Sequence, residues 1–235
     1  MHKMLERVLT TSIMIGGVLL WPAASLAQTS YMVTGADTIV LQNQEALAHV
    51  WHDKSRGDRA LDIFSAIDVN TTPDIIWNIM TDCARGNEIV KGMLSCDILE
   101  TNPAQSSDIR QQVFDMGPFL PNVKTQFESV YDKNKSITIR RVGGDLKIQE
   151  AMWTFEPLET EQTRVSYRAT IAFKLPVPRT ILKNATRKDT PQIMRNLKRV
   201  AEADQEKKFK IVEAPVISPS RASESSTLSS LDEMP

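Results

Sequence analysis

The clearest pattern of apolar and polar positions lies in residues 61–82. Polar residues alternate with apolar ones over 61–69, which is the period of a half-buried strand; the apolar positions are Leu61, Ile63, Ile67 and Val69, and the polar ones Asp62 and Asp68. Thr72, Pro73 and Asp74 then supply a hydroxyl cap, a proline in the first turn and an acid near the positive end of a helix. The segment therefore predicts a strand that leads directly into a helix.

Six further strand patterns follow, after a second short helix or turn in 83–92. Connectors of hairpin length separate them, and the two glycines at 143–144 are a hairpin signal. Parallel strands would need long crossovers, so we expect an antiparallel meander. The predicted strands are 94–100, 108–116, 123–131, 136–142, 146–155 and 163–173.

The longest helical pattern begins at Pro178. Pro191 lies inside it and is expected to kink or restart the helix near Asp189, because proline lacks a backbone donor and clashes with the preceding turn. Apolar residues recur at helical spacing on both sides of Pro191: Ile181, Leu182, Ala185, Ile193, Leu197, Val200 and Ala201.

The N-terminus has the composition of an export signal. Lys3 and Arg7 precede an apolar run from residue 8 to 21, and Ser25 and Ala27 occupy the positions of a signal-peptidase site. We expect cleavage after Ala27 and delivery across the inner membrane to the periplasm. The alternative is an uncleaved membrane anchor, although the run is short for a span of ~20 residues.

The remaining segments are assigned as follows. Residues 28–59 form an N-terminal extension with a short strand at 37–41 and a short helix at 44–51, and residues 60–206 form the main domain. Residues 207–235 are rich in serine and poor in apolar groups, so we expect a disordered tail.

Charge is balanced overall but not locally. The formal net charge is −1, which gives no reason to expect a nucleic-acid partner. Residues 174–210 nevertheless hold 11 Lys or Arg against 4 Asp or Glu. This basic helix is either a solvated surface or a site that contacts anionic lipid headgroups.

The two cysteines, Cys83 and Cys96, are either a disulfide or two separate thiols. An oxidising compartment favours the disulfide slightly, but sequence cannot show that the two residues approach each other. Their spacing matches no zinc pattern. His49, His52 and Asp53 lie in a weakly patterned segment and are best interpreted as solvated, so we expect no metal site and no cofactor.

The order of these elements resembles the helix-grip fold of the START-like (SRPBCC) superfamily. The resemblance is strongest to the branch of polyketide cyclase/dehydrase and coenzyme-Q-binding START domains. It rests on the segments IDVNTTPDIIWNIMTD (67–82), AMWTFEPLETEQTRVSYRATIAF (151–173) and LPVPRTILKNATRKDTPQIMRNLKRVAE (175–202). It implies an α+β fold in which a strongly bent antiparallel sheet of about seven strands wraps around the long C-terminal helix, with two short helices after the first strand.

The resemblance also implies an apolar cavity between the sheet and the C-terminal helix. Alternation along the strands brings small polar and large apolar side chains to one face, which suits a ligand pocket but equally suits a packed core. The predicted ligand-binding residues are Phe127, Ser129, Tyr131, Trp153, Tyr167, Ala169, Leu182, Met194 and Leu197.

Three functions compete. The first is binding of a hydrophobic small molecule, such as a lipid, isoprenoid or quinone-like compound. The second is a cyclase or dehydratase, although residues 60–206 contain no histidine and no nucleophile–base pair, which leaves only Tyr131, Tyr167 and Glu150 as weak candidates. The third is a protein-interaction module with a filled core.

Phe119 and Leu120, beside Gly117 and two prolines, form either a lid, a membrane-inserting tip or a turn that packs on the domain.

Overall fold

A computed structural model describes residues 31–52, 60–117, 121–158, 161–174 and 178–213, with side chains as far as Lys210. The described residues from Val33 to Glu213 belong to one compact unit. The signal peptide predicted at 1–27, the turn with Phe119 and Leu120, and the tail beyond Glu213 lie outside the described residues.

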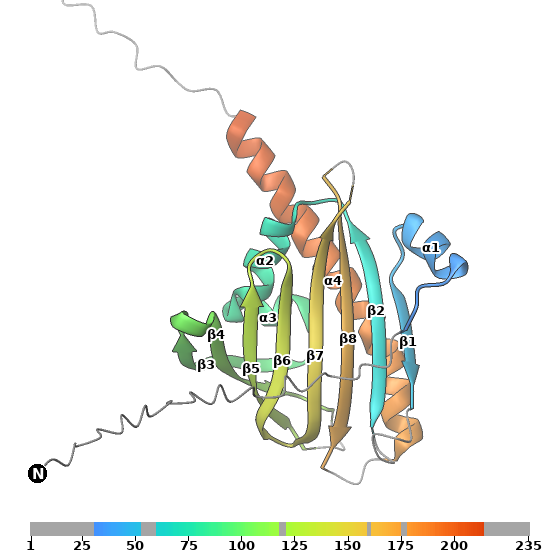
Figure 1. The fold of residues 1–235 in the computed structure, drawn as a ribbon, viewed down its shortest axis with the longest axis vertical. Coiled ribbons are helices and arrows are strands. Elements are labelled where there is room, and N and C mark those ends of the chain that lie inside the picture. The colour runs from blue at the N-terminus through green and yellow to red at the C-terminus, as the bar shows by residue number, and fades with distance from the viewer. Residues whose placement is uncertain (1–30, 53–59, 118–120, 159–160, 175–177, 214–235) are drawn as a thin grey trace, which may run out of the picture. The chain divides into compact units, whose positions relative to one another are not determined.

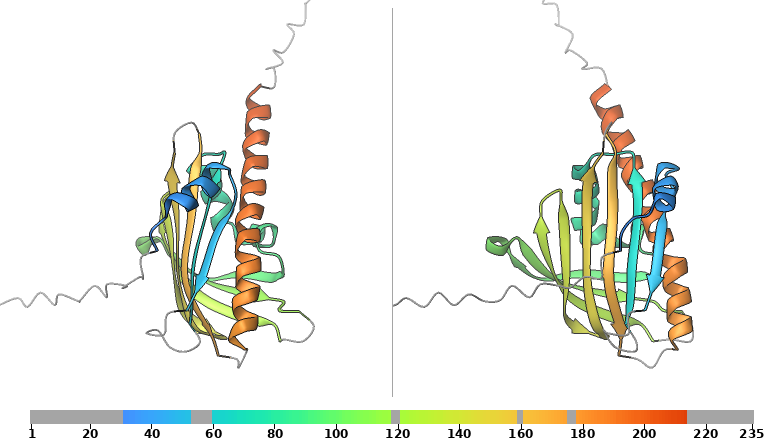
Figure 2. Two further views of the ribbon diagram at one scale, coloured as in Figure 1. Left: turned by 90° about the vertical axis from the view of Figure 1, so that its right-hand side faces the viewer. Right: turned by 45° about the vertical axis from the view of Figure 1, so that its right-hand side comes forward.

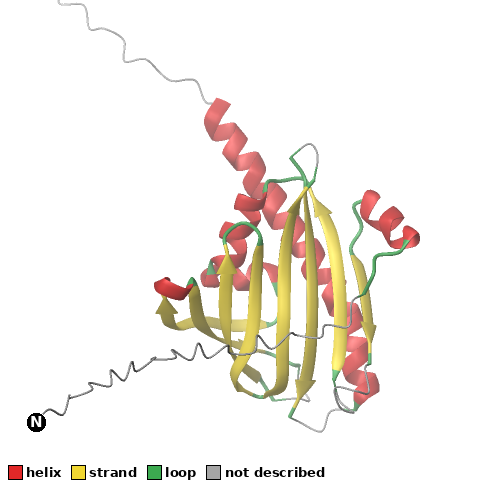
Figure 3. Cartoon of the chain, viewed as in Figure 1, coloured by secondary structure: helices red, strands yellow, loops and turns green. Residues whose placement is uncertain are grey.

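One antiparallel sheet of eight strands forms the body of this unit, in the order β1-β2-β8-β7-β6-β5-β4-β3 (Figure 1). The sheet is curved, and its helices lie mainly against one face (Figure 3). The strands are β1 (Leu47–Trp51), β2 (Leu61–Val69), β3 (Met93–Asn102), β4 (Ser107–Phe114), β5 (Val123–Asp132), β6 (Ser136–Gly144), β7 (Leu146–Pro157) and β8 (Thr163–Phe173). The helices are α1 (Gly35–Gln42), α2 (Pro73–Thr81), α3 (Gly86–Ile89) and α4 (Arg179–Glu213), with short 3₁₀ turns at Cys83–Arg85 and Pro103–Gln105.

The predicted α+β helix-grip fold, the two short helices after the first predicted strand, and the six-stranded meander are confirmed. The β6–β7 hairpin turns at Gly144, whose φ is +80°. A Cβ atom there would lie 2.4 Å from the carbonyl oxygen of Lys124, so this position accepts only glycine.

The predictions for 37–41 and 44–51 are wrong. Residues 37–41 lie in α1, which begins with a capping box in which Thr34 and Asp37 each bind the other's backbone N–H. Residues 47–51 form β1, which pairs with β2 and makes the sheet eight strands wide instead of about seven. The pairing partner of β1 is distant in sequence, so local periodicity could not reveal this strand.

β2 is fully buried along its length, whereas alternation predicted a half-buried strand. It has a neighbour on each side, β1 and β8, and it contacts both α4 and α1. Its polar side chains are paired: Asp62 accepts a hydrogen bond from Thr170 at 2.7 Å, and Asp68 binds Arg164 through two bonds of 2.8 Å. The acids that suggested solvent exposure are therefore bonded within the sheet.

Helix α4 crosses the inner face of the sheet and extends beyond the ends of the strands (Figure 2). It is continuous through Pro191, so the predicted restart near Asp189 does not occur. It also continues to Glu213, past the boundary placed at 206. Asn196 donates to the carbonyl of Ile89 at 2.9 Å, and Lys198 donates to the carbonyl of Asp68 at 2.8 Å. These bonds fix α4 against α3 and β2.

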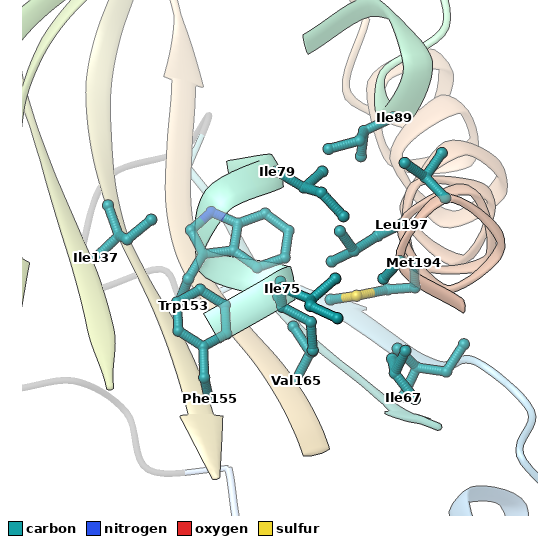
Figure 4. Close-up of a cluster of buried hydrophobic side chains, with 14 residues drawn as sticks. Ile67, Ile75, Ile79, Ile89, Ile137, Trp153, Phe155, Val165, Met194 and Leu197 are labelled. Atoms are coloured by element: carbon teal, nitrogen blue, oxygen red, sulfur yellow. The ribbon is translucent and has the colours of Figure 1, made fainter. Parts of the chain in front are cut away.

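The largest apolar cluster lies where α2, α3, the sheet and the C-terminal half of α4 meet (Figure 4). Ile67, Ile76, Met194 and Leu197 have no exposed surface there. A second cluster lies at the other end of the sheet around Val50, Leu61 and Leu182. The space between these clusters is the site described next.

Candidate functional site

A cavity of about 370 Å³ lies between the inner face of the sheet and α4. Its wall comes from inward side chains of β2 to β8, from α2, α3 and the turns beside them, and from residues 182–194 of α4. Ala185 and Asp189 line it and are exposed to solvent, so the cavity reaches the surface beside this half of α4. Its volume falls in the lower part of the ~300–1,000 Å³ range of small-molecule pockets.

Seven of the nine predicted ligand-binding residues line this cavity: Phe127, Ser129, Tyr131, Trp153, Tyr167, Leu182 and Met194. The other two do not. Ala169 packs in the cluster around Leu61 and Leu182, and Leu197 lies one turn beyond Met194, inside the main core. Both face the interior as predicted, but neighbouring side chains separate them from the open space.

The apolar part of the wall contains an aromatic pair, Trp153 and Tyr167, whose ring centroids are 4.3 Å apart. They lie opposite each other on β7 and β8. Burial raises the pKa of the Tyr167 hydroxyl to about 12. This phenol is therefore neutral at physiological pH and contributes a hydrogen-bonding group without charge.

The polar part of the wall is a buried network on β4 and β5. Arg110 Nε donates to both carboxylate oxygens of Asp108 at 3.0 and 3.1 Å, and Nη2 donates to Asp108 Oδ2 at 3.0 Å. Nη2 also donates to the carbonyl of Thr81, at the end of α2, at 2.7 Å. Tyr131 Oη donates to Asp108 Oδ2 at 2.7 Å. Burial and this hydrogen bond raise the pKa of Tyr131 above its ordinary value.

Sequence reasoning missed Arg110 and Gln112. Asp108, Arg110 and Gln112 occupy alternate positions of β4, so they share the inward face while Ile109, Gln111 and Val113 face outward. The period was visible, but a polar row with apolar residues between it normally marks the solvent face. Only the position of β4 in the curved sheet, with its inner face toward α2 and the cavity, reverses that assignment.

A disulfide joins Cys83 to Cys96, whose Cα atoms are 5.4 Å apart. Both residues line the cavity. The bond links the turn after α2 to β3, the outer strand of the sheet, and Gln112 Nε2 lies 3.7 Å from Cys96 Sγ. The cystine is therefore part of the cavity wall, on the side where β3 has only one neighbouring strand.

A family model described as polyketide cyclase / dehydrase and lipid transport matches residues 69–198, more than half of the chain. The chain belongs to this family. No curated protein sequence gives a significant match.

Solved structures with the same fold include members of both functional classes in the family's description. A STAR-related lipid transfer protein from Xanthomonas axonopodis is 13% identical, with a TM-score of 0.57 over 68% of this chain and 94% of its own. An aromatase/cyclase from a Streptomyces species is 11% identical, with a TM-score of 0.53 over 66% and 98%. The lipid transfer and protein localization domain of human StarD13 is 12% identical, with a TM-score of 0.55 over 65% and 84%. At such identities the likeness concerns the fold alone.

The described wall of the cavity in this member of the polyketide cyclase/dehydrase and lipid transport family contains few ionisable side chains. The ionisable side chains in its described wall are Asp82, Arg110, Tyr131, Tyr167 and Asp189. His49 and His52 are not among the lining residues. No cluster of three metal-ligating side chains occurs in the described residues. The wall thus presents hydrogen-bonding groups and apolar surface.

None of the helices in the described parts of the chain combines the length and the apolar character that a membrane span requires.

Proposed function

We propose that this protein is exported and binds a hydrophobic small molecule, of the lipid, isoprenoid or quinone-like class, in the cavity beneath α4. The observation that carries the proposal is the cavity itself, a space of about 370 Å³ between the sheet and α4. Natural cores leave few voids larger than a water molecule. A space of this size with an apolar aromatic wall and a few polar groups is what a ligand site requires.

The ionisable groups favour binding over catalysis. Both tyrosines in the wall have raised pKa values, so neither supplies a phenolate near neutral pH. Asp108 accepts four hydrogen bonds from Arg110 and Tyr131, which leaves it poorly placed as a base. A cyclase or dehydratase remains the second candidate because the wall is not wholly apolar. The third candidate required a filled core, which the cavity contradicts.

The proposal places the protein in the periplasm. The support is the basic start, the apolar run and the small-residue cleavage site in the first 27 residues of the sequence. A cystine in the cavity wall agrees with an oxidising compartment.

We also propose that the outer face of α4 contacts anionic lipid headgroups. Lys188, Arg195 and Arg199 lie on this exposed face. It is adjacent on the helix to the face that carries Ala185 and Asp189 at the cavity opening. No ion-pair partner for these three cations occurs among the described residues. Nearby acids are already paired, Glu88 and Asp204 with Arg85, and Glu202 with Lys198. A membrane against this face would lie beside the opening through which a ligand enters.

The test of ligand binding is native mass spectrometry of the purified protein, followed by extraction and analysis of bound lipids. Ala185→Trp places a large side chain at the opening, where the alanine is exposed, so it should lower ligand occupancy without unfolding the protein. Ala203→Trp is the matched control, because Ala203 is an exposed alanine of α4 outside the cavity. An empty wild-type protein that also takes up no lipid or quinone probe would refute the proposal.

The test of membrane contact is co-sedimentation with vesicles that contain phosphatidylglycerol. Replacing Lys188, Arg195 and Arg199 with Gln should weaken binding about a hundredfold, since each basic residue near an anionic surface is worth ~1 kcal/mol. The charge-matched control replaces Lys133, Lys135 and Lys147, which are exposed on the β5–β6 turn and on β7. Equal loss in both triple variants would mean that net charge, and not this face, attracts the protein.

A further inference from the structure

Arg110 is a buried arginine with one end of its guanidinium group unpaired. Only 6% of the residue is exposed, and it lines the cavity. Its Nε and Nη2 atoms donate to Asp108 and to the carbonyl of Thr81. Among the described residues, no acceptor binds Nη1. The arrangement fixes the guanidinium on one side and leaves N–H groups free on the other.

An unpaired guanidinium N–H inside a protein requires an acceptor. Arginine carries five donors, cannot lose its proton in a protein and accepts no hydrogen bonds itself. Nearly all such groups in native proteins are satisfied by protein, water or ligand. A ligand in the cavity that places an acceptor atom near Nη1 would take the place of water there and form this hydrogen bond.

The charge around Arg110 decides what kind of acceptor fits. Its positive charge is already balanced by Asp108, with which it forms a close ion pair. It is the only cation among the described residues of the cavity wall, and two further carboxylates, Asp82 and Asp189, line the same space. An anionic headgroup at Nη1 would bring another negative charge into a wall whose acids already outnumber its single cation. A neutral oxygen would take the hydrogen bond without that repulsion.

Apolar side chains lie next to this polar group in the cavity wall. Phe127 lies opposite Arg110 on the neighbouring strand, and Ile139 and Trp153 continue the same inner surface on β6 and β7. A ligand held at Arg110 would thus place a hydrocarbon body against these side chains.

We propose that Arg110 determines specificity: its Nη1 binds a neutral acceptor oxygen (a ketone, ester or alcohol), and the cavity discriminates against carboxylate lipids of the same chain. This inference rests on the proposed binding function and names the chemical class of its ligand. Asp108 sets the preference by neutralising the guanidinium, and Thr81 and Tyr131 hold the pair in place.

The test compares two probes that share one hydrocarbon chain, methyl laurate and laurate, by calorimetric titration of the full-length protein at neutral pH. The wild type should bind methyl laurate at least about tenfold more tightly, which corresponds to ~1.4 kcal/mol. This measurement needs no variant. A wild type that prefers laurate overturns the inference.

Two variants separate specificity from structure. Asp108→Asn keeps the shape of the side chain but removes the balancing charge, so the preference should shift toward laurate by at least about tenfold. Asp108→Asn combined with Arg110→Met removes both charges and the free donors, so binding of methyl laurate should weaken and the preference should fade. The matched control is Asp68→Asn, which disrupts the Asp68–Arg164 ion pair in the same sheet away from the cavity wall. It should lower stability without changing the ratio of the two affinities.

The outcomes distinguish this inference from the function on which it rests. Binding of neither probe, together with an empty purified protein, would contradict the proposed function. Binding of both probes with the same ratio in the wild type and in Asp108→Asn would overturn the role of Arg110 and leave ligand binding intact.

Discussion

The two halves of α4 have the same secondary structure and opposite surroundings. In the C-terminal half, Thr190, Met194, Leu197, Val200, Ala201 and Gln205 are buried at helical spacing. In the N-terminal half, from Arg179 to Asp189, Leu182 is the one buried residue. Residues 182–194 border the cavity, whereas Leu197, Val200 and Ala201 lie in the packed core alone, so a single helix contributes to both stability and binding.

The cause of the difference lies in the elements that face each half. α2 and α3 bring Ile76, Ile79 and Ile89 against Met194 and Leu197, which completes a close-packed cluster (Figure 4). No helix of the described chain takes that place beside the N-terminal half, where α4 faces the sheet across the open space. The two short helices pack against α4 around Met194, and their residues Ile79 and Ile89 also border the cavity there.

Placing an arginine in each half gives the largest expected contrast. Leu197→Arg buries an unpaired charge in a core position with no exposed surface. The free-energy cost of that burial should equal or exceed the ~5–15 kcal/mol by which a typical domain is stable. Ala185→Arg adds the same charge to an exposed position of the other half. Circular dichroism should show an unfolded or insoluble Leu197→Arg protein and a folded Ala185→Arg protein. Two folded proteins of equal stability would show that the assignment of the anchoring half is wrong.

Replacing one leucine by alanine in each half should give a smaller difference in stability in the same direction. Leu197→Ala leaves a void among packed neighbours and should cost about 3–5 kcal/mol of the free energy of unfolding. Leu182 already borders the cavity, has fewer contacts to lose, and should cost about 1–2 kcal/mol when replaced by Ala. Urea unfolding measures both values. Ligand binding should change in Leu182→Ala and persist in Leu197→Ala, and the reverse result would exclude the division proposed for α4.

The cystine stabilises the cavity side, where packing is weaker. Cys83 and Cys96 are 13 residues apart, and a loop of this size corresponds to about 3 kcal/mol in the chain-entropy model. Replacing both with Ser should lower the free energy of unfolding by that amount and should loosen β3, the outer strand. Hydrogen exchange should increase most in β3 and in residues 83–92, and to a smaller extent in the C-terminal half of α4, which contacts residues 85 and 89 through Asp204 and Asn196. A uniform increase across the domain would mean that both regions unfold as one unit.

Much of this division was predictable from local signals. The strand-to-helix switch at 61–82, the meander and the long apolar stripe each follow from periodicity and caps, and together they identified the fold. The errors occurred where pairing distant in sequence decides structure. The local sequence of β1 predicted a helix, and only its pairing with β2 shows that it is a strand. Asp62 and Asp68 of β2 predicted a solvent-exposed face, and only their hydrogen bonds with Thr170 and Arg164 show that they are buried in the sheet.

The site was predictable in outline but not in its chemistry. Alternation placed Phe127, Ser129 and Tyr131 on one inward face, and the structure agrees. Arg110 was missed because an arginine in a polar row normally faces water. Only the curvature of the sheet and the contact with the carbonyl of Thr81, at the end of α2, make it a buried group. Sequence patterns therefore locate a cavity more readily than they identify the polar group inside it.

Acid should weaken the anchoring half through an ion-pair network that joins it to the turn after α2. Arg85 binds Asp204 at 2.5 Å and Glu88 at 2.9 Å, and its hydrogen bonds hold the pKa of both carboxyls below their ordinary values. Because the unfolded chain binds protons more readily, this stabilisation is present at neutral pH, declines below about pH 5 and is lost as the pH falls through the lowered values. Arg85→Gln should cost about 1 kcal/mol at pH 7 and much less at pH 3 in urea unfolding. The control Arg140→Gln removes an exposed ion pair with Glu128 and should lower the free energy of unfolding less at both pH values. If the cost of Arg85→Gln does not change with pH, then the packing of the Arg85 side chain, and not its charge, anchors α4.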